Sequence, residues 1–260
     1  MLLTAQNTTR ELAAAHCDLA LLPVAAMEQH GEHLPTGSKM LVLDAIARRV
    51  GEALPGAVYL LPTLPFGTSA IHAGTPGTVY LGWETLNAVL RDLIESLWAQ
   101  GIRRVAVLAG LGQATSGTVF PWDNSIVKSA VRQLNYDHPD LQAIWVQPLG
   151  VARQELLGIF QTADRERHAG EVITSLLLHL HPEWVKGRGQ DHVPATGQGF
   201  LYYVPFATLC PNGVWGYPGL ATDEKGARAL EAIVRGTVHY VTTTLERLGT
   251  MHDNMQGRQR

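Results

Sequence analysis

The chain has 260 residues, of which 46% are hydrophobic and 26 are glycine, and its formal net charge is −3. This length is sufficient for a sizeable core within one α/β domain. A net charge so close to zero shows no excess of basic residues that would bind nucleic acid, so we expect no nucleic-acid partner. No apolar run approaches the roughly 20 residues of a membrane span, and the first ten residues lack a signal-peptide core.

The two cysteines, Cys17 and Cys210, are far apart and show no C-x-x-C spacing. This spacing indicates neither a zinc cluster nor a disulfide framework. Free thiols are typical of a reducing compartment. We therefore expect a cytoplasmic protein that neither spans nor binds a membrane.

Apolar runs alternate with helical patterns along the whole chain. In chain order, we expect a helix at 9–17, a strand at 19–26, a helix at 42–53, a strand at 57–61, a helix at 85–100, a strand at 103–109, a helix at 118–135, a strand at 143–148 and helices at 168–180 and 227–248. Strands that alternate with helices predict a three-layer αβα fold with a mostly parallel central sheet. We expect a single domain over residues 1–250 and a disordered tail over 251–260.

The segment 27–39, with the sequence MEQHGEHLPTGSK, follows the first predicted strand. Glu28, His30, Glu32 and His33 place four ionisable groups within six positions. Side chains two apart in an extended segment face the same side, so Glu28 and His30 can reach one point. Carboxylates and imidazoles at the carboxyl end of a strand are typical of a metal or acid–base site. A solvated polar loop is the other interpretation.

This segment resembles the E-x-H-G-x-H-L-P signature of the creatininase (creatinine amidohydrolase) family. Further similar blocks follow in the family's order, at 61–69 (LPTLPFGTS) with His72, 76–78 (PGT), 168–175 (HAGEVITS), 212–218 (NGVWGYP) and 221–226 (ATDEKG). The resemblance covers about residues 19 to 245. It implies a creatininase-like fold, homohexamers, and cleavage of C–N bonds in amides by a water molecule bound to divalent metals.

Several metal-ligand positions of the resembled family carry other residues here. Lys39 occupies the position of the aspartate that bridges two metals, Leu111 that of a ligand histidine and Gln113 that of a ligand glutamate. Ile173 stands at a further glutamate position. By the same resemblance, the site keeps Glu28, His30, His33 and His168.

A lysine ammonium cannot act as a ligand while it is charged. Placed where two cations belong, Lys39 would repel them and pair with Glu28, whose buried charge would otherwise be costly. We therefore expect a degenerate metal site with no bound metal and no other cofactor. The other interpretation is that Lys39 points to solvent from the start of a helix.

The remaining candidates are supported by single residues. His168 is a candidate general acid–base, because an imidazole titrates near neutrality, although a capping or buried histidine is equally consistent. With Glu28, His30 and Lys39 it forms the expected catalytic set. We expect His33, Gln113, Trp122 and Trp215 to bind substrate, although tryptophans more often belong to a core or an interface.

Three functions are consistent with this sequence. The first is a repurposed, metal-independent enzyme that cleaves, cyclises or rearranges a small polar substrate with an amide-like or C–N group. The second is a catalytically silent homologue that serves as a binding or scaffold subunit. The third is an amidohydrolase with one metal held by Glu28, His30 and another histidine. In each case we expect a homo-oligomer, by resemblance a hexamer.

Overall fold

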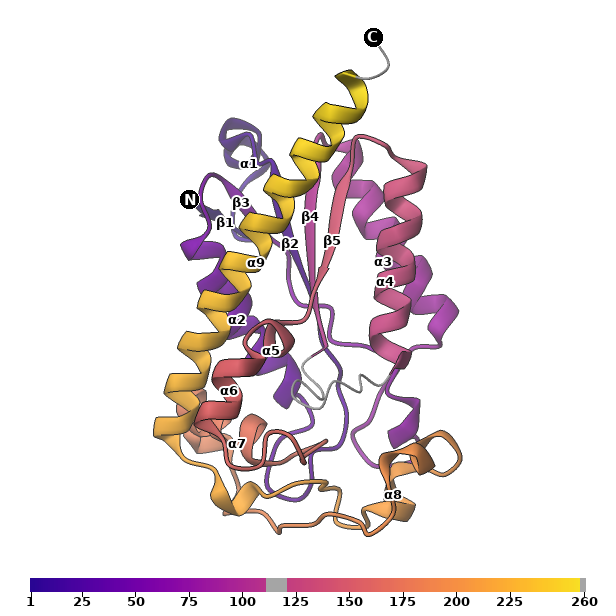
Figure 1. Ribbon diagram of the computed structural model, residues 1–260, viewed down its shortest axis with the longest axis vertical. Coiled ribbons are helices and arrows are strands. Elements are labelled where there is room, and N and C mark those ends of the chain that lie inside the picture. Colours follow the sequence, from indigo (N-terminus) through magenta and orange to yellow (C-terminus); the bar gives the residue numbers. More distant parts are fainter. Residues whose placement is uncertain (111–120, 258–260) are drawn as a thin grey trace.

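The computed structural model describes residues 1–110 and 121–257. Its centre is a sheet of five strands in the order β1-β3-β2-β4-β5, and every pair of neighbours is parallel (Figure 1). The strands are β1 (Leu2–Leu3), β2 (Leu19–Val24), β3 (Val58–Leu60), β4 (Arg104–Ala109) and β5 (Gln142–Val146). The predicted mostly parallel sheet is therefore confirmed.

Helices cover both faces of this sheet, with α2 and α9 on one side and α3 and α4 on the other (Figure 1). The helices of the described residues are α1 (Thr9–Ala15), α2 (Ser38–Ala53), α3 (Trp83–Ala99), α4 (Pro121–Asp137), α5 (Pro148–Val151), α6 (Arg153–Ile159), α7 (Glu171–Leu180), α8 (Phe206–Leu209) and α9 (Asp223–Gly257). The three-layer αβα prediction is confirmed. None of these helices combines the length and the apolar character that crossing a membrane requires.

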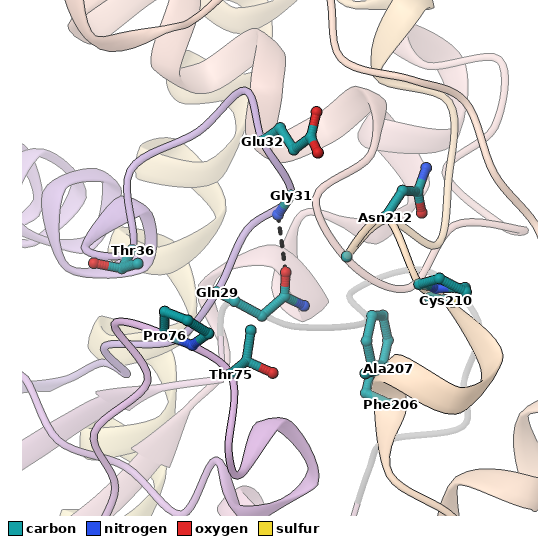
Figure 2. Close-up of a pocket in the computed structure, with 12 residues that line it drawn as sticks. Gln29, Gly31, Glu32, Thr36, Thr75, Pro76, Phe206, Ala207, Cys210 and Asn212 are labelled. Carbon is teal, nitrogen blue, oxygen red and sulfur yellow. Dashed lines mark hydrogen bonds between the residues drawn. The ribbon is translucent and has the colours of Figure 1, made fainter.

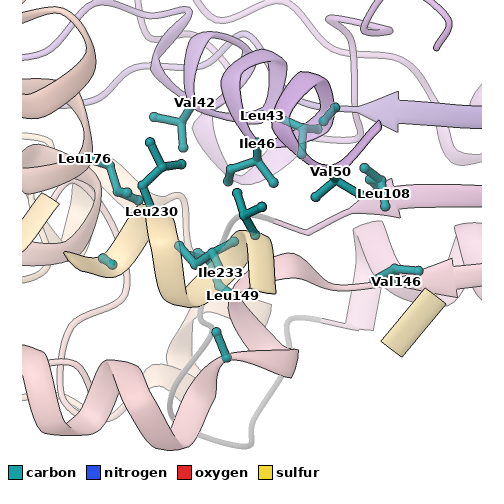
Figure 3. Close-up of a cluster of buried hydrophobic side chains, with 14 of the residues drawn as sticks. Val42, Leu43, Ile46, Val50, Leu108, Val146, Leu149, Leu176, Leu230 and Ile233 are labelled. Carbon is teal, nitrogen blue, oxygen red and sulfur yellow. The ribbon is translucent and has the colours of Figure 1, made fainter. Parts of the chain in front are cut away.

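Apart from Arg104 and Gln142, the first residues of β4 and β5, the strands are apolar because both faces of the sheet are buried. Along β4, Leu108 packs with α2, α7 and α9, whereas its neighbour Val107 packs with α3 and α4. Successive side chains of a strand point to opposite faces, so two separate cores need an unbroken apolar run. Figure 3 shows the first core, where Ile46 of α2 faces Ile233 of α9.

The register of the two central strands determines where the site lies. Leu19 pairs with Arg104, and the pairing continues to Val24 with Ala109, so β2 and β4 end at the same edge of the sheet. Chain segments that leave parallel strands at a common edge form the usual place for a binding site in open α/β folds. The segment that follows β2 contains Glu28 and His30.

Several predicted boundaries are corrected by the structure. Helix α2 begins at Ser38 rather than at 42, and α7 begins at Glu171, so that His168 precedes the helix. Helix α9 continues to Gly257, so residues 251–257 are helical where a disordered tail was expected. The helix continues because residues 251–257 contain no proline and no proline or capping motif ends the helix before them. Their polar composition suggested disorder, but polar residues alone do not prevent a helix.

Ile46 has no exposed surface and lies at the centre of the first core. We expect Ile46→Ala to lower the free energy of unfolding by about 2–5 kcal/mol, because it leaves a cavity that the packed helices cannot fill. Urea denaturation would measure the change. Glu52→Ala, at an exposed position of the same helix, should change it by less than about 0.5 kcal/mol, and equal effects would contradict this packing account.

Candidate active site

The segment after β2 is held in place by hydrogen bonds to its own end and to a second loop. The Glu28 N–H donates to Thr36 O at 3.0 Å, which closes the segment on itself. The Gln29 N–H donates to Thr78 Oγ1 at 3.0 Å, from the loop that follows β3. Gly31 has φ = 68°, a left-handed conformation that glycine adopts at little cost. The backbone therefore fixes where Glu28 and His30 point.

Glu28 and Lys39 form an ion pair inside the protein. The distance between Lys39 Nζ and Glu28 Oε1 is 2.5 Å, and only 15% and 3% of the two side chains are exposed. Ser69 Oγ donates a hydrogen bond to the other carboxylate oxygen, Oε2. Burial is the largest single effect and acts to raise the pKa of Glu28, but the Lys39 ammonium and the three nearby imidazoles together outweigh it, and the pKa lies well below the usual value. Lys39 therefore pairs with Glu28 as predicted and does not point to solvent.

Three imidazole rings lie side by side next to this ion pair. The ring of His168 is 4.4 Å from that of His30 and 4.5 Å from that of His72, between centroids. Phe206 packs against two of them, with centroids 4.6 Å from His72 and 5.1 Å from His168. Burial lowers the pKa of His30 and of His72 to about 4, and that of His168 well below its ordinary value. All three are neutral at pH 7.

The backbone partners of two imidazoles assign their protons. His30 Nδ1 lies 3.0 Å from Glu28 O, and His168 Nε2 lies 2.6 Å from Gln29 O. A carbonyl oxygen only accepts, so each of these nitrogens carries the hydrogen. The lone pairs are therefore His30 Nε2 and His168 Nδ1, and the latter is 3.6 Å from Glu28 Oε1. Both nitrogens can accept a proton.

His72 and Ser69 are site residues that the sequence reasoning missed. His72 ends the short 3-10 helix η1 (Ala70–His72), and its Nε2 is 3.9 Å from Glu28 Oε1. Both residues fall in or beside the resembled block at 61–72, which was the one available signal. The distance between Glu28 and His72 depends on the paths of two loops, which residue spacing does not reveal.

The expectation of a degenerate metal site is wrong. Glu28, His72 and His168 offer ligand atoms that all lie within 4.8 Å of one another. Two imidazoles and one carboxylate are a donor set that zinc accepts, and bonds of about 2.0–2.1 Å place neighbouring ligand atoms about 3.3–3.4 Å apart. The measured 3.6 Å and 3.9 Å separations from Glu28 Oε1 are close to that value. These residues therefore fit one divalent cation.

A pair of bridged cations does not fit the described residues. Glu28 Oε1 has no hydrogen-bond donor in acceptable geometry but is in contact with the Lys39 ammonium. Lys39 stands where the bridging carboxylate is expected by resemblance, and its charge opposes a second cation. One metal and the Lys39 ammonium would compete for the same oxygen atom.

The predicted substrate-binding residues lie in different places. His33 is buried, and its Nε2 lies 3.1 Å from Thr174 Oγ1, outside the group around Glu28. Trp215 is buried with Phe206 and Cys210, and its backbone pairs with that of His168. Trp215 therefore helps to hold His168. Trp122 lies in α4 with its side chain undescribed, and Gln113 and Leu111 lie outside the described residues.

A cavity of about 210 Å³ lies next to the histidine group. Gln29 and Phe206 line it (Figure 2), and both also contact His72 and His168. Its wall is completed by Gly31, Glu32, Thr36, Thr75, Pro76, Ala207, Cys210, Pro211, Asn212 and Gly213. A cavity of this size beside neutral, proton-accepting imidazoles accommodates a small polar molecule.

The fold and the site define a class of protein: a parallel α/β protein with a buried carboxylate–histidine group beside a small cavity at one edge of its sheet. The sequence profile of the creatininase family, described as creatinine amidohydrolase, matches residues 5–241. The chain belongs to the creatininase family.

Known proteins resemble this chain along nearly all of its length. The creatinine amidohydrolase of Pseudomonas putida is 30% identical over 253 residues, which are 90% of this chain and 92% of that protein. A mycofactocin precursor peptide peptidase of Mycolicibacterium smegmatis is 28% identical over 246 residues, with 88% and 86% covered. A crystal structure of creatinine amidohydrolase (creatininase) matches with a TM-score of 0.75 at 27% identity, with 93% and 97% covered.

Removal of the Lys39 ammonium should expose the cost of the buried Glu28 charge. We expect Lys39→Met to lower the free energy of unfolding, measured with chelator present, by about 3–5 kcal/mol. The double variant Lys39→Met with Glu28→Gln should recover most of this loss, because no unpaired charge then remains. Additive losses in the double-mutant cycle would contradict a direct pairing.

Protonation of His33 should destabilise the protein in acid. Burial lowers its folded pKa to about 4, against about 6.5 in an unfolded chain. Above that pH both states are neutral. As the pH falls from about 6.5 to about 4, the unfolded chain takes up protons first, and the free energy of unfolding decreases.

His33→Gln should therefore reduce the pH dependence of the free energy of unfolding in that window. The reduction should correspond to up to about one fewer proton taken up on unfolding. Urea denaturation between pH 7 and pH 4 would measure the slope. His16→Gln, at an exposed position, is the matched control. An identical slope in wild type and His33→Gln would disprove the assignment.

Proposed function

We propose that this creatininase-family protein is a hydrolase that cleaves a C–N bond of a small polar, amide-like substrate. We further propose that the Lys39 ammonium supplies the positive charge at Glu28 and that the reaction needs no metal. The observation that carries this proposal is the 2.5 Å contact between Lys39 Nζ and Glu28 Oε1. The names of the two relatives, which refer to creatinine and to a peptide, support an amide-like substrate.

The side chains of the site have separate roles in this proposal. His168 Nδ1 or His30 Nε2 accepts a proton from a water molecule as the water oxygen attacks the substrate carbonyl carbon. Lys39 donates a hydrogen bond to the oxygen that becomes negative, and a fixed positive donor in a buried site stabilises that charge strongly. The imidazolium then gives its proton to the leaving nitrogen when the C–N bond breaks.

Glu28 has a supporting role. Its lowered pKa keeps it ionised, so it is a poor proton acceptor. It holds Lys39 in place and stabilises an imidazolium that forms at His168, 3.6 Å away. The cavity beside Gln29 and Phe206 is the proposed substrate site, and the amide group of the substrate would have to reach past these two residues to Lys39 and His168, which do not line the cavity.

A second candidate function is supported by the three convergent ligand atoms. Glu28, His72 and His168 would hold one divalent cation, and Lys39 would then have to leave Glu28 Oε1. A bound cation of this kind supplies a water molecule of lowered pKa and polarises a substrate oxygen. The amide-cleaving reaction and the cavity would be the same.

The location in the cytoplasm and the homo-oligomeric state stay predictions. The exposed aromatic side chains of Trp83, Tyr202 and Tyr203, at 64%, 49% and 83%, are consistent with an oligomer contact. Sedimentation of the purified chain would measure its state.

The metal content of active protein distinguishes the candidates. We expect protein purified without chelator or affinity-tag metal to contain less than about 0.1 equivalent of metal and to hydrolyse members of a panel of small cyclic and linear amides. Activity should survive chelator, and Lys39→Met or His168→Ala should lower it by about 10²–10⁴-fold.

Two outcomes would contradict this proposal. About one equivalent of zinc or manganese, whose removal abolishes activity, would identify the one-metal hydrolase. No hydrolysis of any amide, with or without metal, would favour the silent binding homologue.

A further inference from the structure

Gln29 lines the cavity (Figure 2), and its amide nitrogen also contacts the imidazole of His72. We infer that Gln29 is a positioning residue that makes His72 present an N–H rather than a lone pair to Glu28 and thereby selects the Lys39 ammonium over a divalent metal. This inference deepens the proposed function and concerns the same site. It rests on two hydrogen bonds of one amide group.

The Gly31 N–H fixes which end of the Gln29 amide is oxygen. It lies 2.9 Å from Gln29 Oε1, and a backbone N–H can only donate, so the atom that it contacts must be the acceptor. The amide nitrogen Nε2 is therefore the atom that lies 3.1 Å from His72 Nδ1. A rotated amide would place its NH₂ group against the Gly31 N–H, two donors facing each other, and would lose that bond.

The surroundings leave the Gln29 side chain little room to rotate. A Cβ atom built on Gly213 would lie only 2.2 Å from Gln29 Oε1, so the backbone of Gly213 packs directly against the amide. The Gln29 main chain is also held, by Thr78 Oγ1 on one side and by His168 Nε2 on the other.

The amide nitrogen determines the tautomer of His72. Both hydrogens of an NH₂ group are donors, so His72 Nδ1 must offer its lone pair. A neutral His72 then carries its proton on Nε2, which lies 3.9 Å from Glu28 Oε1. An N–H directed at a carboxylate favours the ionised carboxylate, but a protonated nitrogen cannot bind a metal.

His168 provides the contrast. Its Nε2–H donates to Gln29 O, so its Nδ1 lone pair already faces Glu28. Of the three potential ligands, only His72 has the wrong tautomer for a metal. To bind one, His72 would have to move its proton to Nδ1, opposite the Gln29 NH₂ group. Gln29 therefore opposes the metal, and it leaves Glu28 Oε1 to Lys39.

A carboxylate in place of the amide reverses this preference. In Gln29→Glu, one oxygen can still accept from the Gly31 N–H, and the other can accept from His72 Nδ1–H. The lone pair of His72 Nε2 would then face Glu28. A carboxylate that accepts from a ligating histidine is a common partner of metal sites, and such partners change metal affinity by about 10–100-fold.

We therefore expect Gln29→Glu to bind Zn²⁺ about 10–100-fold more tightly than wild type, measured by equilibrium dialysis of the full chain with elemental analysis. Gln29→Met, which removes the donor to Nδ1 without adding a charge, should give a smaller gain. The double variant Gln29→Glu with His72→Gln should lose the gain, because the inference requires His72 as the ligand. A gain that survives in this double variant would overturn it.

The tautomer itself can be measured without metal. In ¹⁵N NMR spectra of the chelated wild type, His72 should carry its proton on Nε2, and in Gln29→Glu on Nδ1. A wild-type proton on Nδ1, or equal zinc affinities of wild type and both Gln29 variants, would overturn the inference. Failure of this inference can be distinguished from failure of the proposed function, because the latter would be seen in the metal content and the amide hydrolysis of the wild type.

Discussion

The negative charge of Glu28 is the constraint on which the rest of the site depends. Its carboxylate is almost completely buried, and an isolated charge in that environment costs several kcal/mol. Two groups stabilise this charge: the Lys39 ammonium forms an ion pair with Oε1, and the Ser69 hydroxyl donates a hydrogen bond to Oε2. Burial keeps the imidazoles around this carboxylate neutral with free lone pairs but also lowers their basicity, so proton uptake at His168 depends on the negative charge of Glu28.

The sheet makes this arrangement possible. Strands β2 and β4 end at one edge, and two hydrogen bonds hold the segment that leaves β2 against the loop after β3, from the Gln29 N–H to Thr78 Oγ1 and from the Val79 N–H to Met27 O. His168 is brought to the same place from a distant part of the chain, through the pairing of its backbone with Trp215. His168 is thus positioned by main-chain contacts with residues remote in sequence.

The chain keeps the creatininase fold while its site has a different charge balance. A lysine where a bridging carboxylate is expected removes one negative charge and adds one positive charge. This exchange excludes a pair of cations but leaves three atoms that fit one, from Glu28, His72 and His168. Which cation occupies Glu28 Oε1 is then decided by small effects, among them the orientation of the Gln29 amide.

The sequence by itself determined the layer architecture and the first motif, and it indicated a pairing of Lys39 with Glu28 that the structure then showed. Runs that are apolar on every residue are typical of strands buried on both faces, and a buried ionised carboxylate is costly unless it is paired or hydrogen-bonded. Only the tertiary structure placed His72, Ser69 and the Gln29 amide around that carboxylate, because their approach depends on loop paths that local residue patterns do not encode. It also decided the imidazole tautomers, since each follows from a hydrogen-bond partner remote in sequence or supplied by the folded backbone.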